Sequence, residues 1–444
     1  MSETPSCCML PESAPFHSYE EVLRHLDSLG LFHMDMGLGR MERALHALGL
    51  DKFRCPAVQI VGTNGKGSTS VFLQSIAMAH GMNVGLYTSP HFVWPEERIQ
   101  LNHTMLPRRV WPALAGNAVQ AEKDLTYFEL LTVMAASAFQ TSESDLMIFE
   151  AGLGGRYDAT TALPVDMVCF APMGMDHLNV LGDTLAAIAD DKSDALRPGV
   201  SVAVSAPQEP EARNILFAKA QERGIPLCCC PTPEGCDGSP AGKALWECLP
   251  DELKVCSVLP DDVTLGLRGA HQRMNAQTAV LAWVMLCQRH HWKTDAHTIA
   301  LGLSRAFIPG RLQFAPAGEG HPAMWLDGAH NPHGMTALIA AVASMFSCLA
   351  DKQPEKLTAL MKQVAGSAPL FVPTIKDNPR AAEAADLARL LGESATAEPS
   401  LEDALSAAGK AAGTKPVLVC GSLYLLSELF TIWPSLLKVS RQAG

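Results

Sequence analysis

The sequence predicts an α/β protein in which a parallel β-sheet with a phosphate-binding loop precedes a smaller, Rossmann-like α/β unit. Three observations predict this fold. Apolar runs without polar alternation are separated by segments with helical spacing, as in a parallel sheet buried on both faces. A glycine-rich loop with one lysine joins the first apolar run to the first helical segment. The alternation of strand and helix patterns resumes beyond residue 311.

The first unit is predicted to span residues 1–306. Its strands are expected where the chain is apolar and β-branched, at 57–61, 83–88, 145–149, 167–171 and 201–205. Its helices are expected where apolar residues recur at helical spacing, at 68–80, 128–139, 184–197, 270–289 and 295–306. The stretch 226–243 is rich in Pro, Gly and Cys and is expected to be irregular.

The second unit is predicted to span residues 312–444, after a linker at 307–311 that contains Pro309 and Gly310. Strands are expected at 323–326 and 416–420, helices near 333–345 and 379–391, and a last helix after the second of these strands. At 444 residues, the chain is long enough for two domains that each bury a core.

The composition excludes several classes of protein. The net charge of -12 argues against a partner that is nucleic acid or an anionic membrane surface. The N-terminus lacks the basic start and apolar core of a signal peptide, and the longest apolar runs are too short to span a bilayer. The 13 cysteines are odd in number and include no Cys-x-x-Cys pair, which favours a reduced, cytoplasmic protein.

The glycine-rich loop is the strongest chemical signal in the chain. Backbone N–H groups of such a turn, together with the N-terminus of the following helix, can cradle a polyphosphate. Lys66 would reach the β- and γ-phosphates, and the hydroxyl of Ser68 or Thr69 would serve Mg²⁺. The pattern is not the plain P-loop, since Gly67 separates the lysine from the hydroxyl. The loop reads Gly62-Thr63-Asn64-Gly65-Lys66-Gly67-Ser68-Thr69.

Further polar clusters follow the predicted strands, at the edge where open parallel sheets bind ligands. Each residue alone has an ordinary structural explanation: a turn for Ser89, a loop histidine for His177, and a surface ion pair for Lys192. Together with Glu150 they supply hard ligands of the kind Mg²⁺ takes beside a γ-phosphate. Glu150 is the strongest candidate, because an acid that ends a buried strand is costly unless something pairs it.

The sequence resembles the folylpolyglutamate synthase/dihydrofolate synthase family of the Mur ligase superfamily. The resemblance covers most of the chain, because the family's landmarks occur in one order. They are Gly62-Thr-Asn-Gly-Lys-Gly-Ser68, Tyr87-Thr-Ser-Pro-His91, Thr126-Tyr-Phe-Glu129, Glu150-Ala-Gly-Leu-Gly-Gly-Arg-Tyr-Asp158, Asp176-His177, Lys192, Asn275-Ala276, Pro309-Gly-Arg311 and Asp327-Gly-Ala-His-Asn-Pro-His333. The resemblance implies a first domain of the Mur ligase central type and a second domain of the glutamate ligase type.

The resemblance also implies roles for individual residues. ATP is expected at the phosphate loop and at Asn275, Arg311, Asp327 and His330. One or two magnesium ions are expected at Ser68, Ser89, Glu150, His177 and Lys192, and the lysine is carbamylated in this family. Lys66, Lys192, His177 and Glu150 are the expected catalytic residues. The pteroate-side ligand is expected at Met34, Asp35, Met36, Gly37, Thr126, Tyr127, Phe128, Glu129 and Asp158.

The implied activity is that of an ATP-dependent amide ligase in folate biosynthesis and one-carbon metabolism. Phosphoryl transfer from ATP would convert a carboxylate of dihydropteroate or a folate into an acyl phosphate, which the amino group of L-glutamate attacks. Closure of the second domain over the nucleotide would exclude water. The expected partners are these small molecules alone, and the expected state is a monomer in the cytoplasm.

Two departures from the family pattern carry expectations of their own. The lysine lies in Asp191-Lys192-Ser193-Asp194, where Asp194 is expected to favour the ammonium form over the neutral amine that carbamylation needs. The span 334–350 is too short for the helix, loop and strand that relatives fit there, so one strand of the second domain is expected to be missing or the helix truncated.

Two alternatives stay open. One is a non-catalytic or weakened ATP-binding homologue, which the short span 334–350 favours and the presence of Arg311 and Asp327 opposes. The other is a Mur-type ligase that joins an amino acid to a sugar-peptide. Such relatives usually carry a separate N-terminal domain, whereas only about sixty residues precede Lys66.

Overall fold

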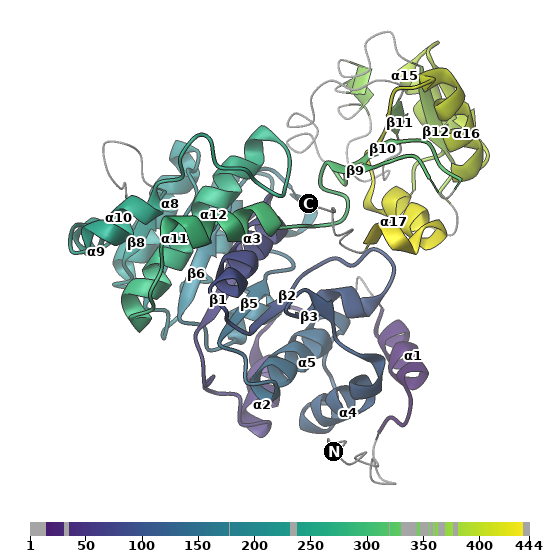
Figure 1. The fold of residues 1–444 in the computed structure, drawn as a ribbon. Helices are drawn as coiled ribbons and strands as arrows, with labels where there is room; N and C mark the ends of the chain where they lie inside the picture. Colours follow the sequence, from purple (N-terminus) through teal and green to yellow (C-terminus); the bar gives the residue numbers. More distant parts are fainter. Residues whose placement is uncertain are drawn as a thin grey trace, which may run out of the picture.

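The structure is a computed structural model. It describes residues 15–30, 35–176, 178–230, 238–318, 320–329, 344–346, 355, 358–359, 361–362, 369–375 and 381–437. Two sheets organise these residues, and each has its own covering helices (Figure 1). Within the described residues, no helix is long and apolar enough to cross a membrane.

The first sheet has eight strands in the order β4-β3-β2-β5-β1-β6-β7-β8. The strands from β2 to β8 along this order run parallel, and β3 and β4 add an antiparallel edge. The bounds are β1 Ala57–Val61, β2 Val84–Tyr87, β3 Ile99–Leu101, β4 Thr104–Met105, β5 Leu146–Glu150, β6 Met167–Phe170, β7 Val202–Ser205 and β8 Leu227–Cys229.

Helices cover both faces of this sheet, because successive side chains of a strand point to opposite faces. In β1, Ala57 and Val61 pack into one core, and Val58 and Ile60 pack into the other. The helices of the first core are α1 Tyr19–Leu29, α2 Gly39–Ala47, α4 Trp111–Ala121, α5 Tyr127–Thr141, α7 Leu185–Ser193 and α8 Pro210–Glu222. Those of the second are α3 Lys66–Ala79, α9 Pro240–Glu247, α10 Asp251–Ser257, α11 Ala270–His290 and α12 Ala296–Arg305.

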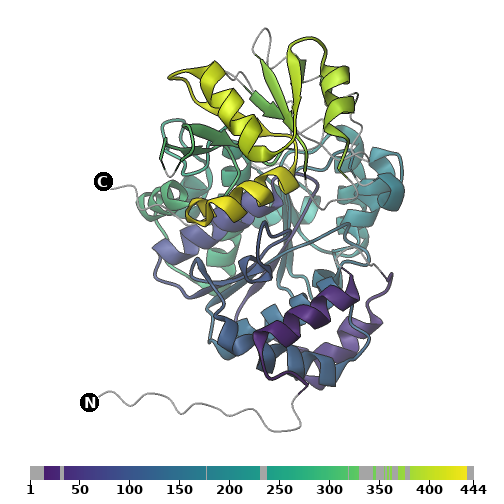
Figure 2. The same ribbon diagram turned by 90° about the vertical axis from the view of Figure 1, so that its right-hand side faces the viewer.

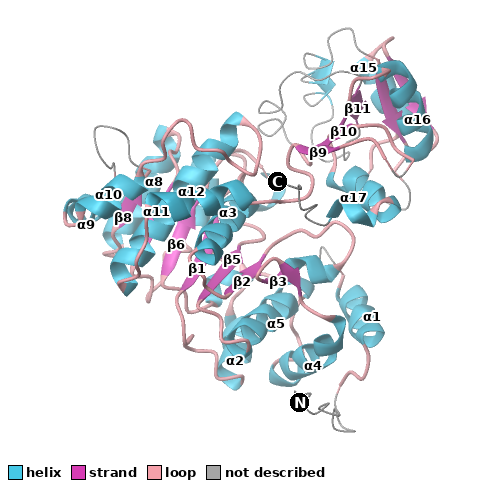
Figure 3. Ribbon diagram, viewed as in Figure 1, coloured by secondary structure: helices cyan, strands magenta, loops and turns pink. Residues whose placement is uncertain are grey.

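The second sheet has six strands in the order β13-β12-β11-β14-β10-β9, and only β9 is antiparallel to its neighbour. The bounds are β9 Gln313–Ala315, β10 Met324–Leu326, β11 Ser344–Phe346, β12 Leu370–Pro373, β13 Ala395–Glu398 and β14 Val417–Cys420. The helices α15 Ala384–Leu391, α16 Leu401–Ala412 and α17 Leu423–Ile432 pack against it (Figure 3). A short helix, α6 Leu178–Leu181, precedes α7 in the first unit.

The two units meet where α17 approaches the loop after β2 (Figure 2). The Ser427 Oγ donates a 2.5 Å hydrogen bond to the carbonyl oxygen of Phe92. The Phe92 ring lies edge-on to the Phe430 ring, with 4.9 Å between centroids. Glu97 shapes this loop, since its carboxylate accepts 2.7 Å hydrogen bonds from the N–H groups of three successive residues, 92–94. This contact joins the second unit to the loop that follows β2.

The predicted fold class is confirmed, and most predicted strands and helices of the first unit are present within a few residues of their expected bounds. The expectation of an irregular 226–243 stretch is wrong, because β8 and the start of α9 lie in it. β8 completes the sheet at its far edge, where its residues 227–229 are buried. The boundary at 307–311 stays a prediction.

The expectation of a missing strand in the second unit is also wrong. β11 lies inside the short span and pairs in parallel with both β12 and β14, so it occupies a central position in the sheet. A three-residue strand needs less chain than the pattern suggested. The predicted helix at 333–345 lies outside the described residues except for its last two, and these belong to β11.

Candidate active site

The phosphate loop lies between β1 and α3, as predicted. Gly65 precedes the helix with φ +84°, a conformation that residues with a side chain rarely adopt. A Cβ at Gly65 would collide with the side-chain oxygen of Asn275 on α11, so these two residues lie in direct contact. Ser68 and Thr69 are buried in the first turn of α3, and the Thr69 hydroxyl has no hydrogen-bond partner among the described residues. The helix therefore presents small polar groups and an open N-terminus, as a phosphate site requires.

Glu150 ends β5 and lies against the phosphate loop. Its carboxylate oxygens are 3.4 and 3.5 Å from the position of a Cβ at Gly67, and one oxygen accepts a 3.2 Å hydrogen bond from the N–H of Ser89. Glu150 is only 5 % exposed, and burial raises the pKa of its carboxyl group. The charges of Lys66, Arg311 and Arg98 oppose this rise. The carboxylate is thus buried among cations of the first unit and of the linker.

Lys192 is a buried lysine near the end of α7, with 3 % exposure. Burial, followed by the nearby charge of Lys66, lowers its pKa from 10.5 to about 7, although Asp191, Asp158 and Asp176 oppose the change. Gly155 allows the backbone of the preceding loop to contact Lys192, since a Cβ there would lie 2.6 Å from the Lys192 carbonyl oxygen. A neutral amine is therefore accessible near neutral pH, which is the form that reacts with CO₂.

The expectation that Asp194 favours the ammonium form of Lys192 stays a prediction, and the contacts of Asp194 weaken it. The Asp194 carboxylate binds Arg156, Lys219 and Arg223 at 2.5–2.6 Å. These three cations compensate its charge, and the largest effects on the pKa of Lys192 come from burial and from other charged residues. Asp194 fastens the end of α7 to α8 and to the loop after β5.

The described residues that were predicted for the pteroate side form two groups, one at Asp158 and one around Glu129 at the start of α5. Asp158 uses both carboxylate oxygens within its own loop, accepting hydrogen bonds from Leu153 N–H and from the N–H and hydroxyl of Thr160. Thr126 and Glu129 form a capping box at the start of α5, and the rings of Phe128 and Tyr87 are 5.6 Å apart. Glu129 is also joined to Asp35 through Arg40, which bonds to both carboxylates. The Arg98 guanidinium lies over the Tyr127 ring. Met36 is 56 % exposed.

The predicted linker contributes Arg311, and the second unit contributes Asp327. Asp327 is 6 % exposed, and its carboxylate accepts hydrogen bonds from the N–H groups of Leu312 and Ala329. Burial raises its pKa, while the charge of Arg311 opposes the rise. Arg311 also lies close enough to lower the pKa of Glu150, which places it between the two units. The predictions for Met34, His177 and His330 lie outside the described residues.

The sequence patterns did not indicate two further candidate residues, Arg98 and Arg40. Arg98 is 4 % exposed, donates a 2.8 Å hydrogen bond to His91 Nδ1 and lies 5.5 Å from the centre of the Tyr127 ring. Burial, followed by the charge of Arg98, lowers the pKa of His91 to about 3. Arg40 is the second candidate. No local sequence signal distinguishes either arginine from a surface residue, because the partners that bury them, Tyr127 for Arg98 and Glu129 for Arg40, are distant in the sequence.

The donor set fits a magnesium ion. Hydroxyl and carboxylate oxygens of Ser68, Ser89 and Glu150 are hard ligands, and Mg²⁺ normally combines one or two carboxylates with waters and phosphate oxygens. Among the described residues, no three His, Cys, Asp or Glu side chains form a cluster that could hold a metal by themselves.

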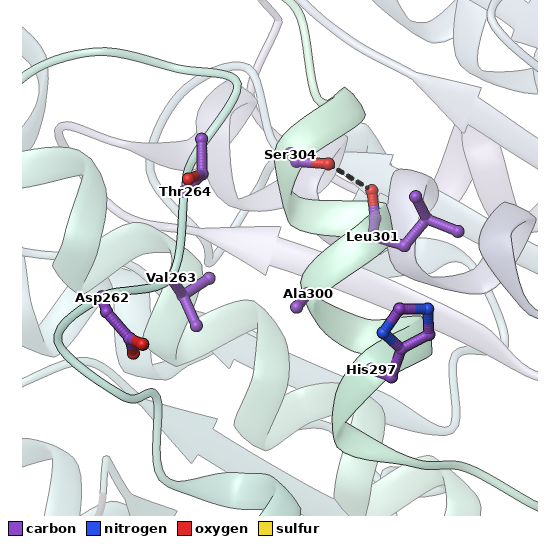
Figure 4. A pocket seen from close by; sticks show the side chains of 7 residues that line it. All are labelled: Asp262, Val263, Thr264, His297, Ala300, Leu301 and Ser304. Atoms are coloured by element: carbon purple, nitrogen blue, oxygen red, sulfur yellow. Dashed lines mark hydrogen bonds between the residues drawn. The ribbon is translucent and has the colours of Figure 1, made fainter.

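Two surface cavities lie apart from the phosphate loop. One, of about 330 Å³, lies between residues 262–264 and α12, where His297 and Ser304 line it (Figure 4). The other, of about 680 Å³, is lined by Arg156, Arg197 and Arg223 around Asp194. Neither cavity includes a residue of the phosphate loop.

Comparison with known proteins gives consistent results. The family described as Mur ligase, glutamate ligase domain, matches residues 310–423. The Escherichia coli dihydrofolate synthase/folylpolyglutamate synthase is 30 % identical over 426 residues, which cover 92 % of this chain and 94 % of that protein. The Bacillus subtilis protein of the same name is 29 % identical over 441 residues, which cover 93 % and 99 %.

Solved structures of such proteins have the same fold. The structure of E. coli FolC in complex with DHPP and ADP matches with a TM-score of 0.76 and 28 % identity, over 94 % of this chain and 98 % of that chain. The Yersinia pestis bifunctional folylpolyglutamate synthase/dihydrofolate synthase complexed with AMPPNP and Mn ion matches with a TM-score of 0.78 and 25 % identity, over the same shares.

Proposed function

The chain belongs to the folylpolyglutamate synthase/dihydrofolate synthase family, and we propose that this ATP-dependent ligase joins L-glutamate to dihydropteroate, to reduced folates, or to both. The observation that carries the proposal is the position of Glu150. Its buried carboxylate lies against the phosphate loop, where the charges of Lys66 and of Arg311 at the end of the linker act on it. Preorganised positive charge of this kind stabilises a transferring phosphoryl group.

The residues have distinct tasks in this reaction. The phosphate loop binds the ATP phosphates through backbone N–H groups, and Lys66 orients the γ-phosphate toward the substrate carboxylate. A carboxylate oxygen attacks the γ-phosphorus, ADP leaves, and the resulting acyl phosphate is attacked by the amino group of glutamate with release of phosphate. Arg311 adds positive charge as the second unit closes, and closure excludes the water that would hydrolyse the acyl phosphate.

Ser68, Ser89 and Glu150 would hold a divalent metal ion, with Lys192 after carbamylation and with His177. Such an ion, when bound, neutralises charge on the phosphate oxygens. Two solved relatives bear on this assignment, since one holds ADP and the other AMPPNP with Mn. Asn275 and Asp327, with His330, are assigned to the nucleotide.

Met36, which is 56 % exposed, lies on a segment predicted for the pteroate side and is accessible to a ligand there. Within this proposal the ligands are small molecules, the protein is a monomer and it acts in the cytoplasm; light scattering after size-exclusion chromatography tests the monomeric state.

Release of ADP tests the proposed function. Purified protein is given ATP, Mg²⁺ and glutamate, with dihydropteroate or tetrahydrofolate in separate assays, and Lys66→Ala serves as the inactive control. Release that needs both glutamate and a pterin supports the ligase, and the better pterin identifies the main activity. ADP release that ignores the pterin would refute the proposal and favour the non-catalytic alternative, which has lost its main argument because β11 is present.

A further inference from the structure

Arg40 connects two segments that are far apart in the sequence. Its Nε and one terminal nitrogen donate 3.0 Å hydrogen bonds to the two carboxylate oxygens of Glu129, at the start of α5. The other terminal nitrogen donates a 2.7 Å hydrogen bond to the Asp35 carboxylate. The nitrogen shared with Glu129 also donates a 2.6 Å bond to the Asp35 backbone carbonyl. One guanidinium thus holds residues 35–38 against α5.

The segment 35–38 has little else to hold it. Its Asp35 side chain is 58 % exposed and its Met36 is 56 % exposed. No side chain caps the N-terminus of α2, and a Cβ at Gly37 would meet nothing within 4 Å. In the described part of the chain, Arg40 donates every side-chain hydrogen bond made to this segment. The orientation of this exposed segment therefore depends on the hydrogen bonds from Arg40.

Glu129, the buried partner of Arg40, is held in place by further contacts and lies near the loop that follows Glu150. Glu129 is 7 % exposed at its side chain, and it also accepts a 2.8 Å hydrogen bond from the Thr126 N–H. The neighbouring Phe128 ring packs against the loop after Glu150, where a Cβ at Gly152 would lie 2.8 Å from the ring. A buried carboxylate with a bidentate arginine is among the strongest polar contacts a protein makes.

We propose that Arg40 is a positioning residue for the pterin end of the substrate: it fixes the Asp35–Met36–Gly37 segment to Glu129 at the start of α5 and so sets the affinity for the pterin without touching ATP. The inference rests on the proposed function, since the Asp35–Met36–Gly37 segment is part of the same proposed site. Lysine cannot replace this arginine, because a single ammonium cannot span both carboxylates in the planar fork geometry.

The chain offers a matched control on the same helix. Arg43 lies one turn further along α2 and pairs with Glu122 at 2.6 Å. This pair is an arginine–carboxylate contact of the same kind, but Arg43 is 62 % exposed and contacts neither Asp35 nor Glu129. Replacing either arginine by methionine removes one charge from α2; the Arg43 variant loses one ion pair, and the Arg40 variant loses the two that the inference concerns.

The experiment compares wild type, Arg40→Met, Arg40→Lys and Arg43→Met in KM for the pterin, KM for ATP and equilibrium binding of the pterin. Arg40→Met is expected to raise the pterin KM and dissociation constant by about tenfold or more, with the KM for ATP within twofold. Arg40→Lys is expected to fall between this variant and wild type, and Arg43→Met to match wild type.

Two results would overturn the inference: an unchanged pterin constant in Arg40→Met, or an equal rise in the constants for pterin and ATP, which marks a general structural defect. If Arg40→Met fails to fold, Asp35→Ala removes the side-chain acceptor of the 2.7 Å bond while Glu129 keeps its arginine, and this variant must raise the pterin KM. Failure of the proposed function is distinguishable, because wild type would then show no pterin-dependent ADP release at all.

Discussion

Lys192 shows how burial changes one residue's chemistry. A lysine among three aspartates in sequence is typical of a surface, yet the fold leaves it 3 % exposed with a pKa of about 7. The sequence could supply the residue and its family resemblance. It could not supply the pKa, since desolvation depends on atoms contributed by distant segments.

Replacing Lys192 by methionine is predicted to abolish turnover and to stabilise the protein at low pH. Between pH 7 and 10.5 the unfolded chain binds a proton at this lysine that the folded chain lacks, so the free energy of unfolding rises with pH. Below pH 7 both states hold the proton and the folded state carries the full penalty. Wild type should therefore be less stable than Lys192→Met at pH 6 and should recover by pH 9, measured by urea unfolding in CO₂-depleted buffer. A difference in the free energy of unfolding between the two proteins that does not change with pH would contradict the lowered pKa of Lys192.

Glu150→Gln is predicted to lower kcat by at least about a hundredfold, because it removes the charge that faces Lys66 and Arg311 and a ligand for the metal. The fold should persist, since glutamine retains the acceptor for the Ser89 N–H. Metal-free ADP binding, measured by calorimetry, should stay within a few-fold of wild type. Near-normal turnover would remove Glu150 from the mechanism.

At the scale of elements, loops at the strand ends act through close backbone contacts. The loop after β5 lies on the end of α7, where Gly155 N–H donates a 2.8 Å hydrogen bond to Asp191 and Thr161 donates a 2.6 Å bond to the Gly155 carbonyl. Sequence periodicity predicted both elements. It did not predict this contact, because the partners are more than thirty residues apart and glycine carries no periodic signal.

Gly155→Ala is predicted to destabilise the protein by about 2 kcal/mol and to lower kcat, because the added Cβ would lie 2.6–2.7 Å from the backbone of Lys192 and must displace α7. Thermal unfolding and steady-state kinetics measure both effects. Gly318→Ala is the control, since a Cβ there meets nothing within 4 Å and the position is exposed. Equal behaviour of the two variants would show that α7 tolerates the displacement.

At the scale of the whole molecule, the site depends on the contact between two units. The loop held by Glu97 carries Phe92 to α17, and the same loop begins at Ser89, whose N–H bonds Glu150. The position of the second unit and the arrangement of the site are therefore joined through one short segment. The linker also contributes, since the Gly310 carbonyl accepts a 2.8 Å hydrogen bond from the Gly328 N–H.

Phe92→Ala is predicted to lower kcat several-fold while ADP affinity of the first unit changes little, because the ring lost is the one that faces Phe430. Calorimetric unfolding should show the second unit melting earlier relative to the first. Exposed Phe314, 43 % accessible on β9, is a matched position whose alanine variant should retain wild-type kcat. A single unchanged transition in Phe92→Ala would mean that this contact does not couple the units.

The sequence by itself determined the order of strands and helices around the phosphate loop, the family and the identity of most candidate residues, because these are carried by local periodicity and short motifs. Only the tertiary structure decided the compensation of Asp194 by three cations, the lowered pKa of Lys192, the central place of β11 and the hydrogen bonds of Arg40. The physical reason is common to all four. Charge compensation, desolvation and strand pairing are interactions between segments distant in the chain, and they exist only once the fold has brought those segments together.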